Sequence, residues 1–207
     1  MRFRLLVVGL VCGLVPDPVA ADQICDRLLP MGLIEPAGGF TSGCSRQFVL
    51  KLGANPGPDG NYILLDFPAC SNGPCAGLTS AAQLQCAAAG GYACCVLSGQ
   101  SVPTLTGTNV GSLAAGLVQR FALDTDTRPG ICFSSYVGNG ARIANVPLAM
   151  FPGIDRTRMV VQTFANVFVV APAAGTGQAT TVTLEFVAMG VTPAGGRSWG
   201  RIKLLYR

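Results

Sequence analysis

Several short segments of the chain alternate hydrophobic and polar residues, which is the pattern of half-buried β-strands. In the first half, residues 46–52 (RQFVLKL) and 61–67 (NYILLDF) show this pattern on either side of the turn-forming segment ANPGPDG. We expect these two strands to form a hairpin with a long loop. In the final third, segments rich in Val, Ile, Thr and Phe predict further strands at residues 142–151, 157–171, 179–189 and 199–206.

Helical patterns lie mainly between these two groups of strands. Residues 79–91 form an alanine-rich segment that a hydroxyl side chain can cap at its start and that a Gly-Gly pair ends. A second helix is expected to begin at Thr106 or Thr108, and Gln119 and Arg120 near its end are expected to face water. Its apolar face carries residues at helical spacing, namely Val110, Leu113, Leu117 and Phe121.

The order of these elements predicts an α+β fold. Helices grouped before a run of strands favour a mostly antiparallel sheet with two or three short helices, the third being a short helix at residues 22–29. Residues 180–186 (TTVTLEF) alternate, which indicates a sheet with one face toward water. We expect one disulfide-stapled domain at residues 22–207, in which a stapled N-terminal segment at 22–45 precedes an α+β body at 46–207.

The first 21 residues have the layout of a secretory signal peptide. A short cationic start (MRFR) precedes the apolar run LLVVGLVCGLV, and Val19-Ala20-Ala21 supplies the small residues of a cleavage site. The apolar run is too short to span a bilayer as a helix. We therefore expect cleavage after Ala21, an extracytoplasmic location (periplasm, cell surface or secreted) and no integral membrane span in the mature chain.

The mature chain keeps eight cysteines after Cys12 leaves with the signal. An even number in an exported chain indicates disulfide bonds, and the residues are Cys25, Cys44, Cys70, Cys75, Cys86, Cys94, Cys95 and Cys132. The turn residues between Cys70 and Cys75 favour a small closed loop, and a Cys25–Cys44 bridge would staple the N-terminal segment to itself. No tight C-x2-C knuckle typical of zinc sites occurs, so neither a metal nor another cofactor is expected.

The adjacent Cys94 and Cys95 leave two interpretations open. A bridge between them would need a strained ring, which redox switches sometimes use. Disulfide geometry favours instead that each points to a different partner, Cys86 or Cys75 on one side and Cys132 on the other. Because most of the cysteines lie around the helices, we expect the bridges to hold the helices onto the sheet.

Composition excludes several classes of function. The chain has no histidine, so Ser-His-Asp and Cys-His sites cannot be built. Its formal net charge of +4 falls to about +3 without the signal, and no Lys/Arg cluster marks a nucleic-acid-binding face. Neither a G-x-S-x-G elbow nor a Walker loop is present. We assign no catalytic residue and expect a protein that is not an enzyme.

Asp124 and Asp126 form a closely spaced carboxylate pair. Such a pair binds calcium where further oxygen ligands converge, but no EF-hand spacing continues the pattern. Asp and Thr in the segment DTDTRPG are typical of a capped turn after a helix. We therefore expect a turn, and ion binding is the alternative.

Much of the chain resembles a known family. The segment VPTLTGTNVG at residues 102–111, followed by GLVQRF at 116–121, looks like a motif of TadG-like proteins of the Tad (Flp) pilus system, in which V-x-T-x-x-G-x-x-V-G precedes a helix that ends in Arg. Before it, residues 60–65 (GNYILL) and Cys94 occur in the family's order. After it come strands similar to those of the family, at residues 142–148 (RIANVPL), 164–169 (FANVFV) and 185–187 (EFV).

The resemblance implies a stand-alone exported form of the C-terminal module of these proteins. Family members usually begin with a membrane helix and can carry a metal-binding D-x-S-x-S segment, whereas this chain has a predicted cleavable signal and no such motif. The implied role is a non-enzymatic envelope or secreted protein, associated with pilus assembly or surface adhesion, that binds other envelope or pilus proteins through a sheet face or edge. Two alternatives are a secreted hydrolase that uses converging carboxylates and a redox protein that uses Cys94 and Cys95.

Overall fold

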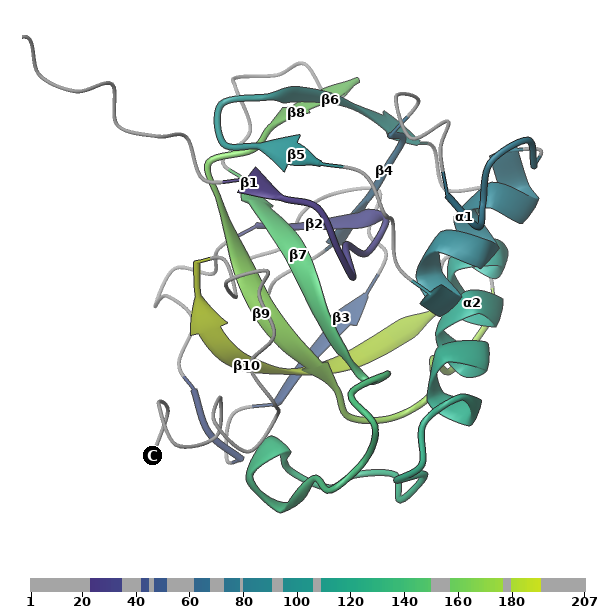
Figure 1. The fold of residues 1–207 in the computed structure, drawn as a ribbon, viewed down its shortest axis with the longest axis vertical. Coiled ribbons are helices and arrows are strands. Elements are labelled where there is room, and N and C mark those ends of the chain that lie inside the picture. Colours follow the sequence, from purple (N-terminus) through teal and green to yellow (C-terminus); the bar gives the residue numbers. More distant parts are fainter. Residues whose placement is uncertain are drawn as a thin grey trace, which may run out of the picture.

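The computed structural model of the chain describes residues 23–34, 42–44, 47–51, 62–67, 73–78, 80–90, 95–105, 109–149, 157–176 and 180–190. Two helices lie side by side and pack against a curled β-sheet (Figure 1). The predicted signal peptide, Cys70, Cys94 and the strand expected at residues 199–206 lie outside the described residues.

Strands predominate among the described elements. In chain order the elements are β1 (Gln23–Ile24), β2 (Met31–Ile34), β3 (Gln47–Lys51), β4 (Tyr62–Leu65), α1 (Ser80–Gly90), β5 (Val96–Leu97), β6 (Ser101–Leu105), α2 (Val110–Ala122), the 3-10 helix η2 (Phe133–Ser135), β7 (Ile143–Ala149), β8 (Arg158–Val160), β9 (Thr163–Val169) and β10 (Thr181–Met189).

Eight of these strands form one sheet, in the order β3-β10-β9-β7-β2-β4-β6-β8. Its pairings are antiparallel except between β2 and β7, which run parallel with Leu33 opposite Leu148. The sheet is therefore mixed rather than wholly antiparallel. The α+β architecture with two helices agrees with the prediction at this coarser level.

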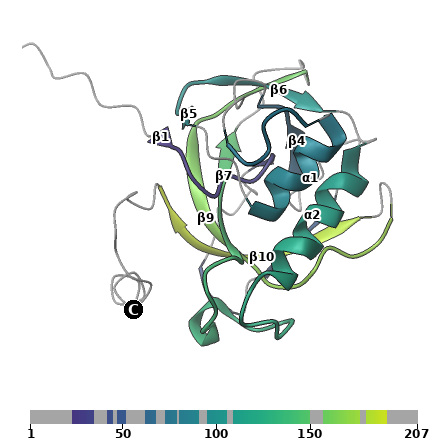
Figure 2. The ribbon, with the colours of Figure 1, turned by 45° about the vertical axis from the view of Figure 1, so that its right-hand side comes forward.

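The short strand β2 joins the two halves of the sheet. Met31 and Leu33 are buried where β2 lies between β7 and β4. Just before it, the backbone N–H of Leu29 donates to the carbonyl of Asn145, and the Asn145 amide donates to the carbonyl of Asp26 at 2.9 Å. Figure 2 shows this N-terminal stretch running beside β7. The start of the described chain is thus inserted into the middle of the sheet.

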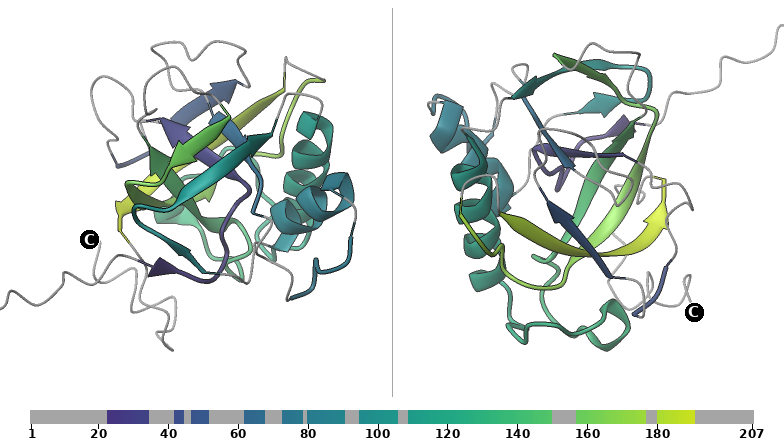
Figure 3. Two further views of the ribbon diagram at one scale, coloured as in Figure 1. Left: turned by 90° about the horizontal axis from the view of Figure 1, so that it is seen from above. Right: turned by 180° about the vertical axis from the view of Figure 1, so that it is seen from behind.

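The two helices pack closely because α2 has a glycine at the contact. A Cβ atom at Gly116 would lie 2.3 Å from the carbonyl oxygen of Gln85 and 2.5 Å from the Cβ of Ala88. On the inner side of α2, Leu113 and Leu117 join the apolar side chains of the sheet in the main core. Viewed from behind, the helix pair lies at one side of the molecule (Figure 3).

The residue patterns of the sequence predicted the two helices and most of the described strands correctly. The alanine-rich helix and the second helix are confirmed as α1 and α2. The prediction of a sheet with one wet face is confirmed in the first half of β10, where Val182 and Leu184 are buried and Thr181 and Thr183 are partly exposed.

Three predictions of secondary structure and pairing are wrong. Residues 22–29 contain no helix among those described; β1 lies there and pairs with β5. β3 and β4 form no hairpin, because β3 pairs with β10 and β4 pairs with β2 and β6. The strand expected at residues 157–171 is interrupted at Val161 and Gln162. Before this break β8 pairs with β6, and after it β9 pairs with β7 in the middle of the sheet.

Candidate functional site

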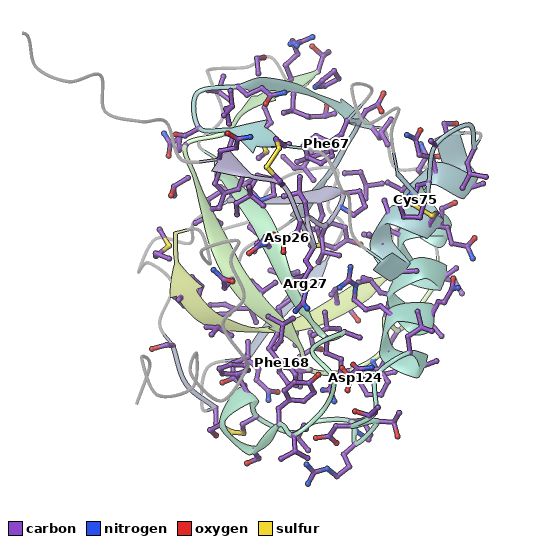
Figure 4. The ribbon with its side chains drawn as sticks, viewed as in Figure 1. Asp26, Arg27, Phe67, Cys75, Asp124 and Phe168 are labelled. Carbon is purple, nitrogen blue, oxygen red and sulfur yellow. A yellow bond between two sulfur atoms is a disulfide. The ribbon has the colours of Figure 1, made fainter. Side chains whose placement is uncertain are left out.

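Buried polar groups gather in the segment between α2 and β7. Asp124, Asp126, Tyr136 and Arg142 all lie below the surface there, beside Phe168 of β9. Figure 4 places Asp124 and Phe168 near one another at the end of the molecule where this segment turns back. The segment follows the last turn of α2 and ends where β7 enters the sheet, so both of its ends are fixed.

Arg142 is the centre of this cluster, with an exposed fraction of 0%. Its guanidinium donates to four backbone carbonyls: those of Val169 and Val170 at 2.7 Å each, Asp126 at 2.9 Å and Arg128 at 3.0 Å. These carbonyls come from the end of β9 and from the turn after α2. The side chain therefore ties the turn to the sheet.

Aromatic rings enclose the same guanidinium. Its central carbon lies 4.3 Å from the ring centroid of Phe121 and 4.3 Å from that of Phe168, within the range of a cation–π contact. Burial lowers the pKa of Arg142, and the nearby Asp124 and Asp126 oppose that shift. An arginine starts so far above neutral pH that it keeps its charge here.

Asp124 holds the turn from the opposite side. One carboxylate oxygen accepts the backbone N–H of Asp126 at 2.8 Å, and the other accepts the backbone N–H of Arg142 at 3.0 Å and the hydroxyl of Tyr136. The Tyr136 oxygen in turn accepts the backbone N–H of Gly140 at 2.6 Å. Burial, reinforced by the hydrogen bond to Asp124, raises the pKa of Tyr136, so its hydroxyl stays protonated and donates.

Asp126 completes the turn with a charged partner. Both of its oxygens accept from Arg128 at 2.8 Å, and one also accepts the backbone N–H of Val137 at 3.1 Å. The side chain of Arg128 is 57% exposed and that of Asp126 only 3%. The hydrogen bond from Arg128 holds the pKa of Asp126 well below its usual range, although burial opposes it.

These contacts decide how the carboxylate pair is used. The oxygens of Asp124 and Asp126 are engaged by protein donors, and the N–H of Asp126 bonded to Asp124 closes the turn locally. The predicted capped turn is confirmed. Within the described part of the chain, no group of three or more Cys, Asp or Glu side chains is placed to hold a metal ion.

The expectation that Arg120 faces water is wrong. Its side chain is 2% exposed, and it donates to the carbonyls of Ala88 at 2.6 Å and Ala141 at 2.8 Å. Arg120 thus tethers the end of α2 to the end of α1 and to the segment before β7. Burial, helped by the charge of Arg27, lowers the pKa of Arg120 to about 10.

Glu185 is a further buried charged side chain at this end of the sheet. It lies in β10, and one carboxylate oxygen accepts the backbone N–H of Phe133, the first residue of η2, at 2.8 Å. Burial raises the pKa of Glu185, and the hydrogen bond from Phe133 acts in the opposite direction. Like Asp124 and Asp126, Glu185 positions backbone.

The disulfides correct the predicted pairings. Cys25 pairs with Cys95, Cys44 with Cys132, and Cys75 with Cys86. The Cys25–Cys44 and Cys70–Cys75 bridges are therefore wrong, and so is the assignment of Cys132 to one of the adjacent cysteines. Two bridges join segments that lie 70 and 88 residues apart in sequence, a separation that leaves no local signal.

Two consequences follow for function. Because Cys95 is bonded to Cys25, it forms no vicinal bridge with Cys94, and the redox switch loses its basis. The three bridges of the described residues also do not fix the helices to the sheet as expected: one joins the end of β1 to the start of β5, one reaches η2, and one closes the loop before α1 onto α1 itself. Three disulfides fit an oxidising, extracytoplasmic location.

The two helices border a second feature, a depression of about 450 Å³. Its lining residues include Pro74, Ala82, Gln85, Ala89, Gln119 and Leu123. None of them carries a charge, and the depression lies on the solvent side of the helix pair.

Sequence reasoning missed Tyr136 and Arg142 as members of the cluster. Arg142 binds backbone carbonyls, which every residue has, so its partners leave no mark in the sequence. The Asp-Thr-Asp-Thr-Arg spacing could have indicated the pair of Asp126 and Arg128, since both residues lie in one turn.

Comparisons with family models, with curated proteins and with solved structures found no match to this chain. Within the described residues, neither helix has the length and apolar character that a membrane crossing requires.

Proposed function

We propose that this protein is a non-enzymatic component of the cell envelope or of secreted material, and that it acts by binding other proteins in pilus-type assembly or surface adhesion. The observation that carries the proposal is the Val137 loop, residues 136–140. Its backbone is fixed from several directions, while the side chain of Val137 is 79% exposed.

The fixation of this loop is extensive. The N–H of Val137 is held by Asp126, and the N–H of Gly140 by Tyr136. The side chain of Asn139 donates to the carbonyl of Leu123 at 2.9 Å and accepts the N–H of Ala141 at 3.0 Å. Behind this loop, Arg142 anchors the preceding turn to the sheet. Several buried polar groups thus serve to hold an exposed valine in one place.

A rigid, exposed apolar residue suits protein recognition. Association is opposed by the loss of side-chain and loop freedom, and a loop that is already ordered avoids much of that cost. Val137 would be the anchor, and the exposed guanidinium of Arg128, held by Asp126, would lie at the polar rim. The buried carboxylates of this region are used to build the surface, which favours binding over catalysis.

The residues of the family resemblance support the same proposal. Arg120 and Arg142 are the arginines of the two resembling segments, and both are buried. Arg120 joins the ends of the two helices, and Arg142 joins the turn after α2 to the sheet. The resembling strand segments include β4, β9 and the centre of β10, which belong to one sheet. A module that shares these residues would share this scaffold and present the same loop.

Affinity capture from envelope fractions of the source cells tests the proposal. The bait is the oxidised full-length mature chain, and the matched variants are Val137→Asp and Val49→Asp, which place the same charge on an exposed valine of the loop and of β3. We expect pilus or secretion components to be enriched by wild type and by the Val49 variant, and lost with the Val137 variant. Recovery of no such component by wild type would overturn the proposal. Equal recovery by both variants would refute the role of the loop.

A further inference from the structure

Two arginines from distant parts of the chain lie together beside the start of β7. Arg27, labelled in Figure 4, belongs to the N-terminal stretch that runs along β7, and Arg120 belongs to the last turn of α2. Nη1 of Arg27 donates to the carbonyl of Gly140 at 3.3 Å, and Nη1 of Arg120 donates to the carbonyl of Ala141 at 2.8 Å. Consecutive residues have Cα atoms about 3.8 Å apart, so the two guanidinium groups are close neighbours.

The charge of Arg120 is incompletely compensated. Its side chain is 2% exposed, and Nε donates to the carbonyl of Ala88, but Nη2 is buried and has no hydrogen-bond partner within the described structure. Burial lowers the pKa of Arg120, the charge of Arg27 lowers it further, and no carboxylate of the described residues opposes these effects. A buried charge is costly unless it is paired and hydrogen-bonded.

Arg142 shows how the same fold compensates a buried arginine more fully. Its guanidinium donates to four carbonyls, and the carboxylates of Asp124 and Asp126 oppose the effect of burial on its pKa. Arg120 has two carbonyls, and a neighbouring cation in place of the two carboxylates. What distinguishes the surroundings of Arg120 is therefore a deficit of negative charge, which a bound anion would supply.

The backbone holds Arg27 in a conformation that bulky residues rarely adopt. Its φ of 50° lies in the left-handed region, and among the described residues no other except glycine has a positive φ. Hydrogen bonds to β7 fix this conformation: the carbonyl of Arg27 accepts the N–H of Asn145 at 3.0 Å, and the N–H of Leu29 donates to the carbonyl of Asn145 at 2.9 Å. Backbone strain of this kind clusters at binding and active sites, and here it fixes one arginine beside another.

We propose that Arg27 and Arg120 bind a small oxyanion, such as phosphate or sulfate, through Nη2 of Arg120 and the guanidinium of Arg27. Planar guanidinium donors match the oxygens of such anions, and these hydrogen bonds are charge-assisted. The anion supplies both the missing acceptor and the missing negative charge. It enters from the side of Arg27, which is half-buried, whereas Arg120 is not accessible from the surface.

The burial of Nη2 favours a free ion over the phosphate groups of a membrane surface or of a nucleic acid, which cannot leave their polymer or bilayer to reach it. The proposal stands apart from the function proposed for the Val137 loop. It concerns the isolated chain and a dissolved ion, so its test needs no protein partner, and either proposal can fail without the other.

Titration of the oxidised mature chain with inorganic phosphate and with sulfate, at an ionic strength held constant with sodium chloride, tests the proposal. The NMR signals of the arginine side-chain N–H groups and the Tm are followed together. We expect saturable shifts of the Arg27 and Arg120 signals, with a dissociation constant of about 1 mM or lower. Vesicles of anionic phospholipid provide the head-group arm and should produce no such shifts.

Three variants locate the effect. Arg27→Gln should raise the dissociation constant by about 10–100-fold, which corresponds to the loss of one charged hydrogen bond. Arg27→Lys keeps the charge and should restore most of the affinity. Arg158→Gln is the matched control, since it removes an exposed arginine from β8, and it should leave the dissociation constant unchanged.

Each result bears on the proposal. The absence of saturable shifts with both anions, shifts with vesicles alone, or an affinity that Arg27→Gln leaves unchanged would overturn it. Sulfate and phosphate also stabilise folded proteins without binding to a site, so the Tm is compared between wild type and Arg27→Gln in the same solutions. If Arg27 were only structural, the variant would lower Tm equally with and without phosphate, and this result would also overturn the proposal.

Discussion

Replacing Arg142 by methionine tests whether the buried guanidinium holds the turn after α2 to the sheet. Methionine keeps an unbranched apolar stem and removes the charged donors. Four hydrogen bonds are lost, to the carbonyls of Asp126, Arg128, Val169 and Val170.

The magnitude of the effect follows from these contacts. A hydrogen bond from a charged donor contributes about 1.5–3 kcal/mol, which gives an upper limit of about 6–12 kcal/mol for four. Burial of the methionine side chain returns about 1.5–3 kcal/mol, and relaxation of the turn toward water reduces the loss further. We expect a decrease of about 4 kcal/mol in the free energy of unfolding, comparable to breaking a buried charged contact.

Thermal and denaturant unfolding of the oxidised chain at neutral pH measure this change. For a chain of this size, about 4 kcal/mol corresponds to a decrease in Tm of about 8–16 °C. Arg158→Met is the matched control, because Arg158 is exposed and bonds only to Ser101 within the described residues. It should change stability by less than about 0.5 kcal/mol. If the free energy of unfolding of the Arg142 variant lay within about 1 kcal/mol of that of this control, the reasoning would be refuted.

Three other predictions concern helix packing, a buried carboxylate and a disulfide. Gly116→Ala should lower Tm, because the added methyl group would clash with a carbonyl of α1. Gly111→Ala in the same helix meets nothing within 4 Å and should raise the free energy of unfolding by about 0.5–1 kcal/mol. Equal changes of Tm in the two variants, measured by calorimetry, would contradict this. Glu185→Gln should stabilise the chain increasingly as pH rises above 4.5, the ordinary pKa of a glutamate. Burial raises the pKa of Glu185 in the folded state, so wild type loses stability as this carboxyl ionises, and the glutamine variant does not. A difference in Tm between variant and wild type that stays constant from acid to neutral pH would argue against this. Non-reducing peptide mapping should recover Cys75 linked to Cys86, and finding either with another partner would disprove this pairing.

Elements that depend on neighbouring residues were predictable from the sequence. The alanine-rich α1 and the apolar face of α2 follow from helical spacing, which is a local property. The turn at Asp124 is also local, since its carboxylate bonds to the backbone two residues later. Such features need no knowledge of the rest of the chain.

Elements that depend on distant residues were not predictable in the same way. The partner of β3 is β10, near the other end of the described chain, and hydrophobic alternation does not name a partner. The disulfides between segments 70 and 88 residues apart share this property. Arg120 was expected at the surface because charged residues usually lie there. Its burial depends on carbonyls of α1 and of the turn before β7, which only the fold brings within reach.

The position of β2 sets the order in which the chain can fold. This strand is made early, and in the order of the sheet it stands between the group β3-β10-β9-β7 and the group β4-β6-β8. Its parallel partner, β7, leaves the ribosome much later, so neither half of the sheet can dock until most of the chain has been synthesised. Pairings between such distant segments close slowly and leave strand edges exposed in the meantime. Folding of this protein should therefore be largely post-translational, and its yield should depend on whatever shields β2 and the edge of β7 during that interval.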